Sequence, residues 1–232
     1  MRKKIEFATD VDFIEFPMPA KKHVPEWYKK SDRLVGDKLQ VNNITASGLK
    51  TVKMCAPFLD SLTNGYIIEL LQDVYVTKDL SGNQSLVWKI GEVEMAERRD
   101  IEGLGGMPIS SEYSEQAFAW KCHWVWRTPK GYSALVTHPL NRMDLPFTTF
   151  SGIVDSETAI SKGNLPFLIK KDFEGVISAG TPIAQILPYK RESWEAINNP
   201  GLIRDGLRQS FLTNKVSGGW YKNNHWFKKD FS

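Results

Sequence analysis

The segment Pro146-Phe-Thr-Thr-Phe-Ser-Gly-Ile-Val-Asp-Ser-Glu157 is followed by Leu165-Pro-Phe-Leu-Ile-Lys170 and by Gly180-Thr-Pro-Ile-Ala-Gln-Ile-Leu-Pro-Tyr-Lys-Arg191. These apolar runs are rich in Ile, Val, Leu and Phe, and Gly, Asn, Asp and Pro separate them. This pattern is typical of consecutive strands joined by tight turns. We therefore expect residues 146–191 to be β structure and the chain to be mainly β.

The composition limits the classes of protein to which the chain can belong. It has 232 residues, of which 41% are apolar and 12% aromatic, enough to bury a sizeable core and to exclude disorder throughout. The net charge of +3 is spread in small clusters. Such a charge is compatible with a phosphorylated small-molecule partner and argues against nucleic acid.

Cysteine usage and hydropathy indicate a compartment. Cys55 and Cys122 lie far apart, without further ligands at metal-binding spacing, so we expect buried free thiols, no metal and a reducing cytoplasm. Residues 1–6 are basic without a following apolar run, and no apolar stretch approaches the ~18 residues of a membrane span. The sequence thus predicts neither export nor membrane insertion.

The N-terminal part alternates predicted strands with loops. We expect a strand at Lys4–Ala8, a short helix after Pro25 and a loop over 31–50 that includes Asn42-Asn43. The run Tyr66–Thr77 favours one long strand, which a turn at 79–84 joins to a strand at 85–90. Trp27, at the start of the helix, either packs the segment onto the protein or forms a pocket wall.

The run Phe118-Ala-Trp-Lys-Cys-His-Trp-Val-Trp126 predicts one aromatic strand. Its alternation places one set of side chains on the core face: Phe118, Trp120, Cys122, Trp124 and Trp126. His123 falls on the other face beside Lys121, where a solvated histidine is expected. Residues 91–117 are the least regular part of the sequence, and their glycines match neither a P-loop nor a dinucleotide fingerprint.

The C-terminal residues differ from the rest of the chain. We expect one β-rich domain over residues 1–190, followed over 191–232 by a helical segment and an aromatic, basic tail. Helices are predicted at Arg191–Ile197 and Leu202–Phe211. The aromatic and basic residues of 220–229 either dock on the protein or a partner subunit, or stack on bases and pair with phosphates.

Several segments between residues 125 and 191 resemble motifs of the dUTPase and dCTP deaminase superfamily, whose fold is the β-clip. The similar segments are Pro129-Lys-Gly131, His138-Pro-Leu-Asn-Arg142, Gly152-Ile-Val-Asp155 and Gly180 to Leu187. The resemblance implies a β-clip core, a nucleotide pocket and a homo-oligomer, with the trimer of β-clip proteins as the precedent.

The motifs of catalysis are degraded in this chain. The phosphate-binding Pro-Arg-Ser-Gly of the family is missing, and Glu157 follows Asp155 without the aromatic residue that packs on the base. Ser217-Gly-Gly-Trp220 is a faint counterpart of the family's glycine-rich arm. The resemblance therefore implies the fold more strongly than the reaction.

Other segments along most of the chain resemble a family of tailed-phage proteins. They include Pro-Glu-Trp-Tyr-Lys (25–29), Cys-Ala-Pro-Phe-Leu-Asp-Ser-Leu-Thr-Asn-Gly-Tyr-Ile-Ile (55–68) and Pro-Tyr-Lys-Arg-Glu-Ser-Trp (188–194). This resemblance implies a viral origin and brings no established activity with it.

Together the two resemblances predict a noncatalytic protein in the cytoplasm of an infected bacterial host. It would sequester a nucleotide-derived molecule, such as a cyclic nucleotide or an ADP-ribose derivative used as a host immune signal. Aromatic stacking and cation–phosphate contacts would supply affinity. The candidate ligand-binding residues are Trp27, Tyr66, His138, Arg142, Asp155, Gln185, Lys190 and Arg191.

Two alternatives are open at the level of sequence. The first is a dUTPase-like nucleoside triphosphate pyrophosphatase, in which Asp155 and Glu157 would be catalytic and Mg²⁺ the cofactor. The second is a virion or assembly protein. The sequestering protein would need no cofactor.

Overall fold

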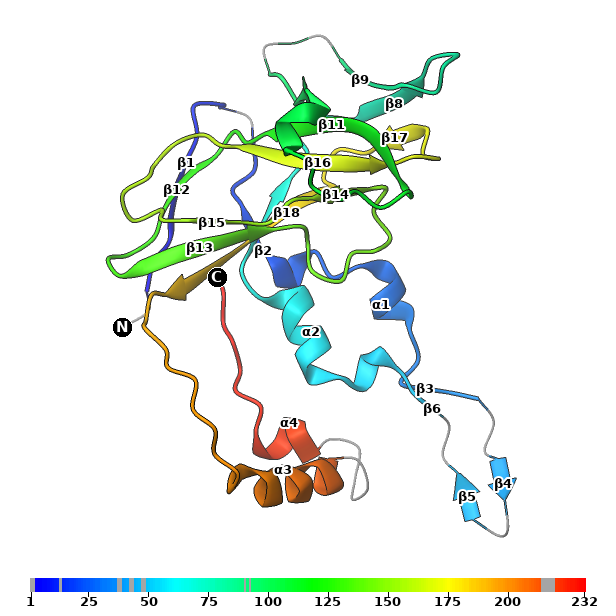
Figure 1. The fold of residues 1–232 in the computed structure, drawn as a ribbon, viewed down its shortest axis with the longest axis vertical. Helices are drawn as coiled ribbons and strands as arrows, with labels where there is room; N and C mark the ends of the chain where they lie inside the picture. The colour runs from blue at the N-terminus through cyan, green and yellow to red at the C-terminus, as the bar shows by residue number, and fades with distance from the viewer. Residues whose placement is uncertain are drawn as a thin grey trace. The chain divides into compact units, whose positions relative to one another are not determined.

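The computed structural model describes residues 3–12, 14–36, 39–41, 44–46, 49–89, 91, 93–213 and 220–232. These residues form two compact units (Figure 1). Unit 1 comprises Met1–His23, Gly65–Arg191 and Phe231–Ser232, whereas unit 2 comprises Val24–Asn64 and Glu192–Asp230. One boundary coincides with the predicted division near residue 191, but unit 2 also contains residues 24–64. The fold is mainly β, in antiparallel sheets, as predicted.

A five-stranded antiparallel sheet is central to unit 1. Its strand order is β15 (Gly152–Val154), β13 (Tyr132–Thr137), β18 (Pro182–Lys190), β7 (Tyr66–Glu69) and β2 (Met18–Pro19). The 3₁₀ helix η1 (Ala20–Lys22) follows β2 directly. Strands β15 and β18 lie within residues 146–191, which the sequence predicted to be β.

A second antiparallel sheet has four strands. Its order is β10 (Ala96–Arg99), β11 (Tyr113–Lys121), β16 (Asn164–Lys170) and β14 (Phe147–Thr149). The 3₁₀ helix η3 (Ile101–Leu104) lies between β10 and β11. Part of the predicted irregular segment 91–117 is therefore ordered as β10, η3 and the start of β11.

Two smaller sheets complete unit 1. The predicted hairpin is present as β8 (Val74–Lys78) and β9 (Gln84–Trp88), and β17 (Gly175–Ile177) pairs with β8 on its other side. The predicted N-terminal strand is β1 (Glu6–Ala8), which pairs with β12 (Val125–Arg127).

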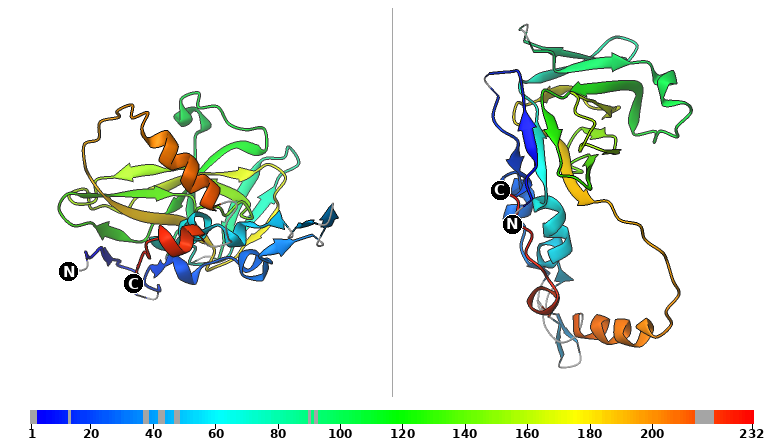
Figure 2. Two further views of the ribbon diagram at one scale, coloured as in Figure 1. Left: turned by 90° about the horizontal axis from the view of Figure 1, so that it is seen from below. Right: turned by 90° about the vertical axis from the view of Figure 1, so that its left-hand side faces the viewer.

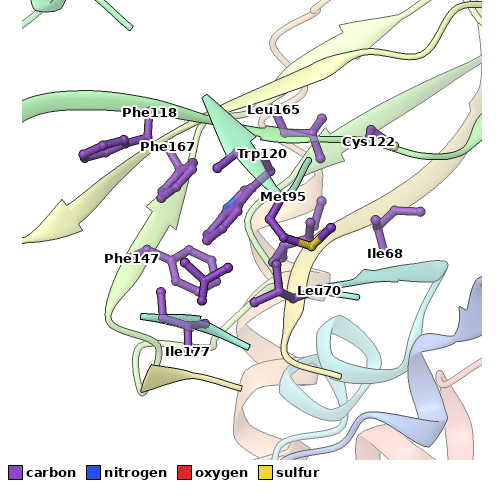
Figure 3. Packing of buried hydrophobic residues seen from close by; sticks show 14 of the residues in the cluster. Ile68, Leu70, Met95, Phe118, Trp120, Cys122, Phe147, Leu165, Phe167 and Ile177 are labelled. Atoms are coloured by element: carbon purple, nitrogen blue, oxygen red, sulfur yellow. The ribbon is translucent and has the colours of Figure 1, made fainter. Parts of the chain in front are cut away.

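The two larger sheets share one apolar core. Trp120 of β11 stacks on Phe167 of β16, with ring centroids 3.7 Å apart, and Phe147 of β14 meets both rings edge-on (Figure 3). From the five-stranded sheet, Ile68 belongs to the same cluster. The five predicted core-facing residues of 118–126 are all buried, as predicted, and Ala119 on the other face is buried as well.

Unit 2 combines short helices with short strands. Its helices are α1 (Glu26–Lys30), α2 (Ala56–Thr63), α3 (Leu202–Phe211) and α4 (Trp220–Asn224), with the 3₁₀ helix η2 (Val52–Met54) before α2. Its strands form the pairs β3 (Leu34–Val35) with β6 (Leu49–Lys50) and β4 (Leu39–Val41) with β5 (Ile44–Ala46). Tyr28 of α1 stacks on Phe58 of α2 at 5.9 Å.

Two predicted long strands are each divided in the structure. Over Tyr66–Thr77, the chain leaves β7 at Leu70, whose N–H donates to Thr181 O, and resumes as β8 in another sheet. Over 118–126, β11 ends at Lys121 and β12 begins at Val125 to pair with β1. A polar pair, Gln72-Asp73, lies at the first break, whereas at the second break the aromatic pattern continues through Trp124.

The prediction of a loop over 31–50 was wrong for most of its described residues. Strands β3 to β6 lie there and pair with one another. β-branched and aliphatic residues are interspersed among the polar ones, and such residues favour strands. Asn42-Asn43 and Ser217–Gly219 lie outside the described residues, as does Ile90 at the end of the predicted hairpin.

The predicted helix over Arg191–Ile197 is also wrong. The Arg191 N–H donates to Gly131 O, and residues 191–199 have no regular secondary structure. A helix of this length is marginal without a packed face, and Trp194 and Ile197 remain exposed. The expectation of two buried thiols holds for Cys122 and fails for Cys55, which is exposed.

Candidate functional site

Unit 1 contains a cavity of about 330 Å³ beside strand β7. This volume is near the lower end of the range of small-molecule sites, roughly 300–1,000 Å³. The lining combines an aromatic wall, aliphatic side chains and two carboxylates: Ile14, Glu15, Pro17, Ile67, Glu69, Leu70, Leu71, Trp124 and Gly180.

Glu69 is the principal polar group of this cavity. It ends β7, after three buried residues, and its side chain is only 27% exposed. Burial raises the pKa of the Glu69 carboxyl above its ordinary value, and the charge of Glu15 raises it further. The pair therefore forms an acidic, partly desolvated surface, which favours hydrogen-bond donors or cations and disfavours anions.

His23 contacts the Glu69 carboxyl. Its Nδ1 lies 3.2 Å from Glu69 Oε1. Burial lowers the pKa of His23, and the charges of Arg142 and Lys22 lower it further. Because burial lowers the pKa of His23, we describe the contact as a hydrogen bond in which a neutral imidazole donates to the carboxylate. The Nε2 atom of His23 is buried and has no hydrogen-bond partner among the described residues.

The aromatic wall is fixed by ring contacts. Trp124 lies between β11 and β12, and it meets Phe16 edge-on at 5.8 Å and Phe7 at 6.4 Å. Phe7 in turn meets Tyr66 at 5.4 Å. Aromatic contacts of this kind contribute about 0.5–1.5 kcal/mol each beyond area burial. The Trp124 ring is therefore a rigid wall.

Three of the predicted site residues meet at one end of the β13–β18 pair. Arg191 Nη1 lies 3.6 Å from Asp155 Oδ1, and Nη2 donates to Glu157 Oε2. Asp155 also accepts from Ser133 Oγ at 2.6 Å, and Glu157 accepts from the Gly131 N–H at 2.8 Å. We call Asp155, Glu157 and Arg191 the Arg191 cluster.

The Arg191 cluster does not fit a magnesium ion. The guanidinium already pairs with both carboxylates, and a second cation there would be repelled by it. The Gly131 N–H and Arg191 lower the pKa of Glu157, which keeps the carboxylate ionised for this pairing. The arrangement ties the end of β18 to the segment after β15.

Another group of predicted residues lies at the opposite end of the same strand pair. Tyr132 pairs with Lys190 and Thr137 with Gln185, so about 17 Å of strand separates the two ends. His138 Nδ1 accepts from the Thr149 N–H at 3.3 Å, and Nε2 donates to Arg142 O at 3.2 Å. Burial lowers the pKa of His138, consistent with this neutral tautomer.

Arg142 and Gln185 make local contacts at this second end. Arg142 binds Asp144 through Nε at 2.9 Å and Nη2 at 2.9 Å, and Gln185 Oε1 accepts from the Leu140 N–H at 2.8 Å. These contacts fix the turn after β13. The predicted residues of unit 1 thus do not converge on one pocket.

The other three predicted residues are placed separately. Lys190 is exposed at the end of β18. Tyr66 is buried, and its ring meets Phe231 edge-on at 5.8 Å. Trp27 belongs to unit 2, where it is 38% exposed and meets Tyr28 and Phe58 edge-on. Within unit 2, Trp226 of the tail docks on Asp60, with Nε1 at 3.0 Å from each carboxylate oxygen.

Sequence reasoning missed the residues that line the cavity. A signal existed for Glu69, because a carboxylate interrupts the apolar run Tyr-Ile-Ile-Glu-Leu-Leu (66–71). Buried carboxylates require a reason, which is often functional. Glu15 and Trp124 carry no such signal, since each sits in an ordinary alternation of residue types.

Comparison with known proteins assigns no family. No protein-family model matches the chain, and a search of curated proteins finds no match. No helix in the described part of the chain has the length and apolar character needed to cross a membrane. Among the same residues, no group of three or more His, Cys, Asp or Glu is placed to hold a metal ion.

Proposed function

We propose that this chain is a noncatalytic binding protein that sequesters a nucleotide-derived small molecule, with the base in the cavity beside Glu69. One observation carries the proposal: two carboxylates and a fixed tryptophan line the same cavity. Aromatic and apolar walls with a few polar groups are the general composition of small-molecule sites.

The carboxylates select the kind of base. A carboxylate accepts two parallel N–H bonds from one edge of a planar group. Guanine presents two neighbouring N–H donors, at N1 and at its amino group, whereas adenine presents an acceptor at N1. Glu69, with Glu15 beside it, therefore favours a guanine-type base over adenine.

The phosphates of such a ligand would lie outside the cavity, because Glu15 and Glu69 repel them. Lys22 is exposed at the end of η1 and is close enough to His23 to lower its pKa. We assign Lys22 to the phosphate, since an exposed ammonium can follow a mobile anionic group.

The resemblance to β-clip nucleotide proteins belongs to the same proposal. The two similar segments, Gly152–Asp155 and Gly180–Leu187, include parts of β15 and β18, which flank β13 in one sheet. The pairing of β15 and β18 with the same strand, β13, supports a β-clip core. By analogy with tailed-phage proteins, the use we propose is removal of a nucleotide signal inside an infected bacterial cell.

A capture experiment tests the proposed function. The purified protein is incubated with guanine, adenine and pyrimidine nucleotides, cyclic dinucleotides and cyclic ADP-ribose, with and without Mg²⁺, and then filtered, denatured and chromatographed. We expect a guanine-bearing compound to be depleted and recovered intact only after denaturation. Cleaved products that form with Mg²⁺ would instead establish the pyrophosphatase. In that case, loss of cleavage in Asp155→Ala would show that Asp155 takes part in the reaction. Depletion of no compound would contradict binding.

A further inference from the structure

Helix α3 of unit 2 presents an exposed apolar side. At 100° per residue, Leu202, Ile203, Leu207 and Phe211 fall on one half of the helix, and the opposite half carries Arg204, Asp205, Arg208 and Gln209. Each of the four apolar side chains is between 61% and 66% exposed.

The segment before α3 adds to this surface. Residues 192–199 run without regular secondary structure towards the helix, as the orange trace in Figure 2 shows. Trp194 and Ile197 in this segment are 86% and 77% exposed. We call these two residues and the four apolar residues of α3 the arm surface.

We propose that the arm surface binds the arm surface of a second copy of this chain. Burying a large apolar side chain removes on the order of 100 Å² from water. Six such residues on each of two copies would bury about 1,200 Å², the lower bound of a standard stable interface.

The shape of the helix favours a like partner. Gly206 and Ser210 lie within the apolar half, and a side chain added at Gly206 would meet nothing within 4 Å. The gap at Gly206 accepts a large side chain, such as Leu207 of a second copy packed antiparallel. A surface that carries both the gap and the side chain that fills it is self-complementary, as a two-fold interface requires.

The charges of α3 disfavour a membrane as the binding partner of the arm surface. Its polar half carries Arg204, Arg208 and Asp205, a net charge of only one. Helices that lie on membranes are typically rich in Lys and Arg on the polar face, and lipid-binding clusters contain about 4–8 such residues. The apolar half is therefore suited to protein rather than to anionic lipid.

Light scattering coupled to size exclusion tests this assignment over a wide range of concentrations. We expect the full chain to have at least twice its chain mass, and Leu207→Asp to weaken self-association by about 100-fold. Arg204→Asp places the same acid on the polar half and is the matched control, which should keep the wild-type mass. Circular dichroism should show equal folding, because both positions are on the surface of the helix.

Three results would overturn the proposal. The first is a wild-type mass of one chain at every concentration. The second is an equal mass for wild type and Leu207→Asp, which would place self-association elsewhere. The third is a monomeric wild type that cosediments with phosphatidylserine–phosphatidylcholine vesicles, which would assign the arm surface to lipid.

Discussion

Glu69 shows how one residue's surroundings set the chemistry of the proposed site. To accept two N–H bonds from a base, its carboxyl must be ionised. Burial and Glu15 raise the pKa of this carboxyl, so protonation begins at a higher pH than for an ordinary glutamate. We expect the affinity for guanosine monophosphate to fall as the pH is lowered from neutral to mildly acidic.

Calorimetric titration across this pH range checks the expectation for Glu69. In Glu69→Gln the affinity should be low and should vary less with pH, because the titrating acceptor is gone. If the wild-type profile followed that of Glu69→Gln, the Glu69 carboxyl would have no part in binding.

The Arg191 cluster predicts a dependence of stability on pH. The Gly131 N–H and Arg191 lower the pKa of Glu157 in the folded protein. A carboxyl with a lowered folded pKa stabilises the fold above its unfolded pKa, and the stabilisation is lost as the pH falls through the folded pKa. Glu157→Gln should therefore melt below wild type at neutral pH, and the difference should close in acid. A difference that is constant with pH would contradict this role.

At the residue scale, the sequence indicated candidate site residues but not which side chains each of them contacts. Asp155, Glu157 and Arg191 were predicted as candidate site residues, and the structure brings them together. Their mutual pairing could not be predicted, because strand register determines which charges meet. His138 and Arg142 lie at the other end of β13 for the same reason.

Among the elements, the junction before β7 depends on a single glycine. Gly65 has φ of +77°, and a Cβ there would lie 2.2 Å from Ile186 O of β18. Since a backbone atom cannot move aside cheaply, we expect Gly65→Ala to lower the free energy of unfolding by roughly 3 kcal/mol or more.

Gly82 in the β8–β9 turn provides the matched control for Gly65. Its φ is +81°, but an added Cβ would meet nothing within 4 Å. Gly82→Ala should therefore cost only about 1–2 kcal/mol, from backbone conformation alone. Denaturant titration measures both variants, and equal losses would show that the contact with Ile186 is unimportant.

The strands at 146–191 were predictable because turn residues separate short apolar runs. The break inside 118–126 was not, because the aromatic alternation continues across it, and the break inside 66–77 was missed although the polar pair Gln72-Asp73 lies there. The predicted helix at 191–197 failed for a further reason. Its local pattern is helical, but a short helix needs a packed face, and Trp194 and Ile197 are exposed.

At the scale of the whole molecule, the two cysteines belong to different units and differ in exposure. Cys55 belongs to unit 2 and is exposed, whereas Cys122 of unit 1 is buried, and burial raises its pKa to about 11. Because the thiolate is the reactive form, Ellman's reagent should label one thiol rapidly in the native protein and the second only on unfolding. Two rapid reactions would contradict the described packing around Cys122.

The cavity could not be predicted from the sequence because its residues come from distant parts of the chain. Residues 14–17, 67–71, 124 and 180 meet only after β7 has paired with β18. The sequence did predict the β class and several strands. It directed the search for a site towards aromatic residues and cations that would bind a nucleotide, whereas the structure also shows a cavity lined in part by two carboxylates.

The most direct test of the proposed function compares the dissociation constants of guanosine monophosphate for wild type, Glu69→Gln and Glu115→Gln. Glu115 is an exposed residue of β11, so its variant controls for the loss of one negative charge. A hydrogen bond to a charged group contributes about 1.5–3 kcal/mol, so Glu69→Gln should weaken binding by roughly 10- to 100-fold. Glu115→Gln should bind as wild type does. Equal constants for all three proteins, or conversion of the nucleotide by wild type, would contradict noncatalytic binding beside Glu69.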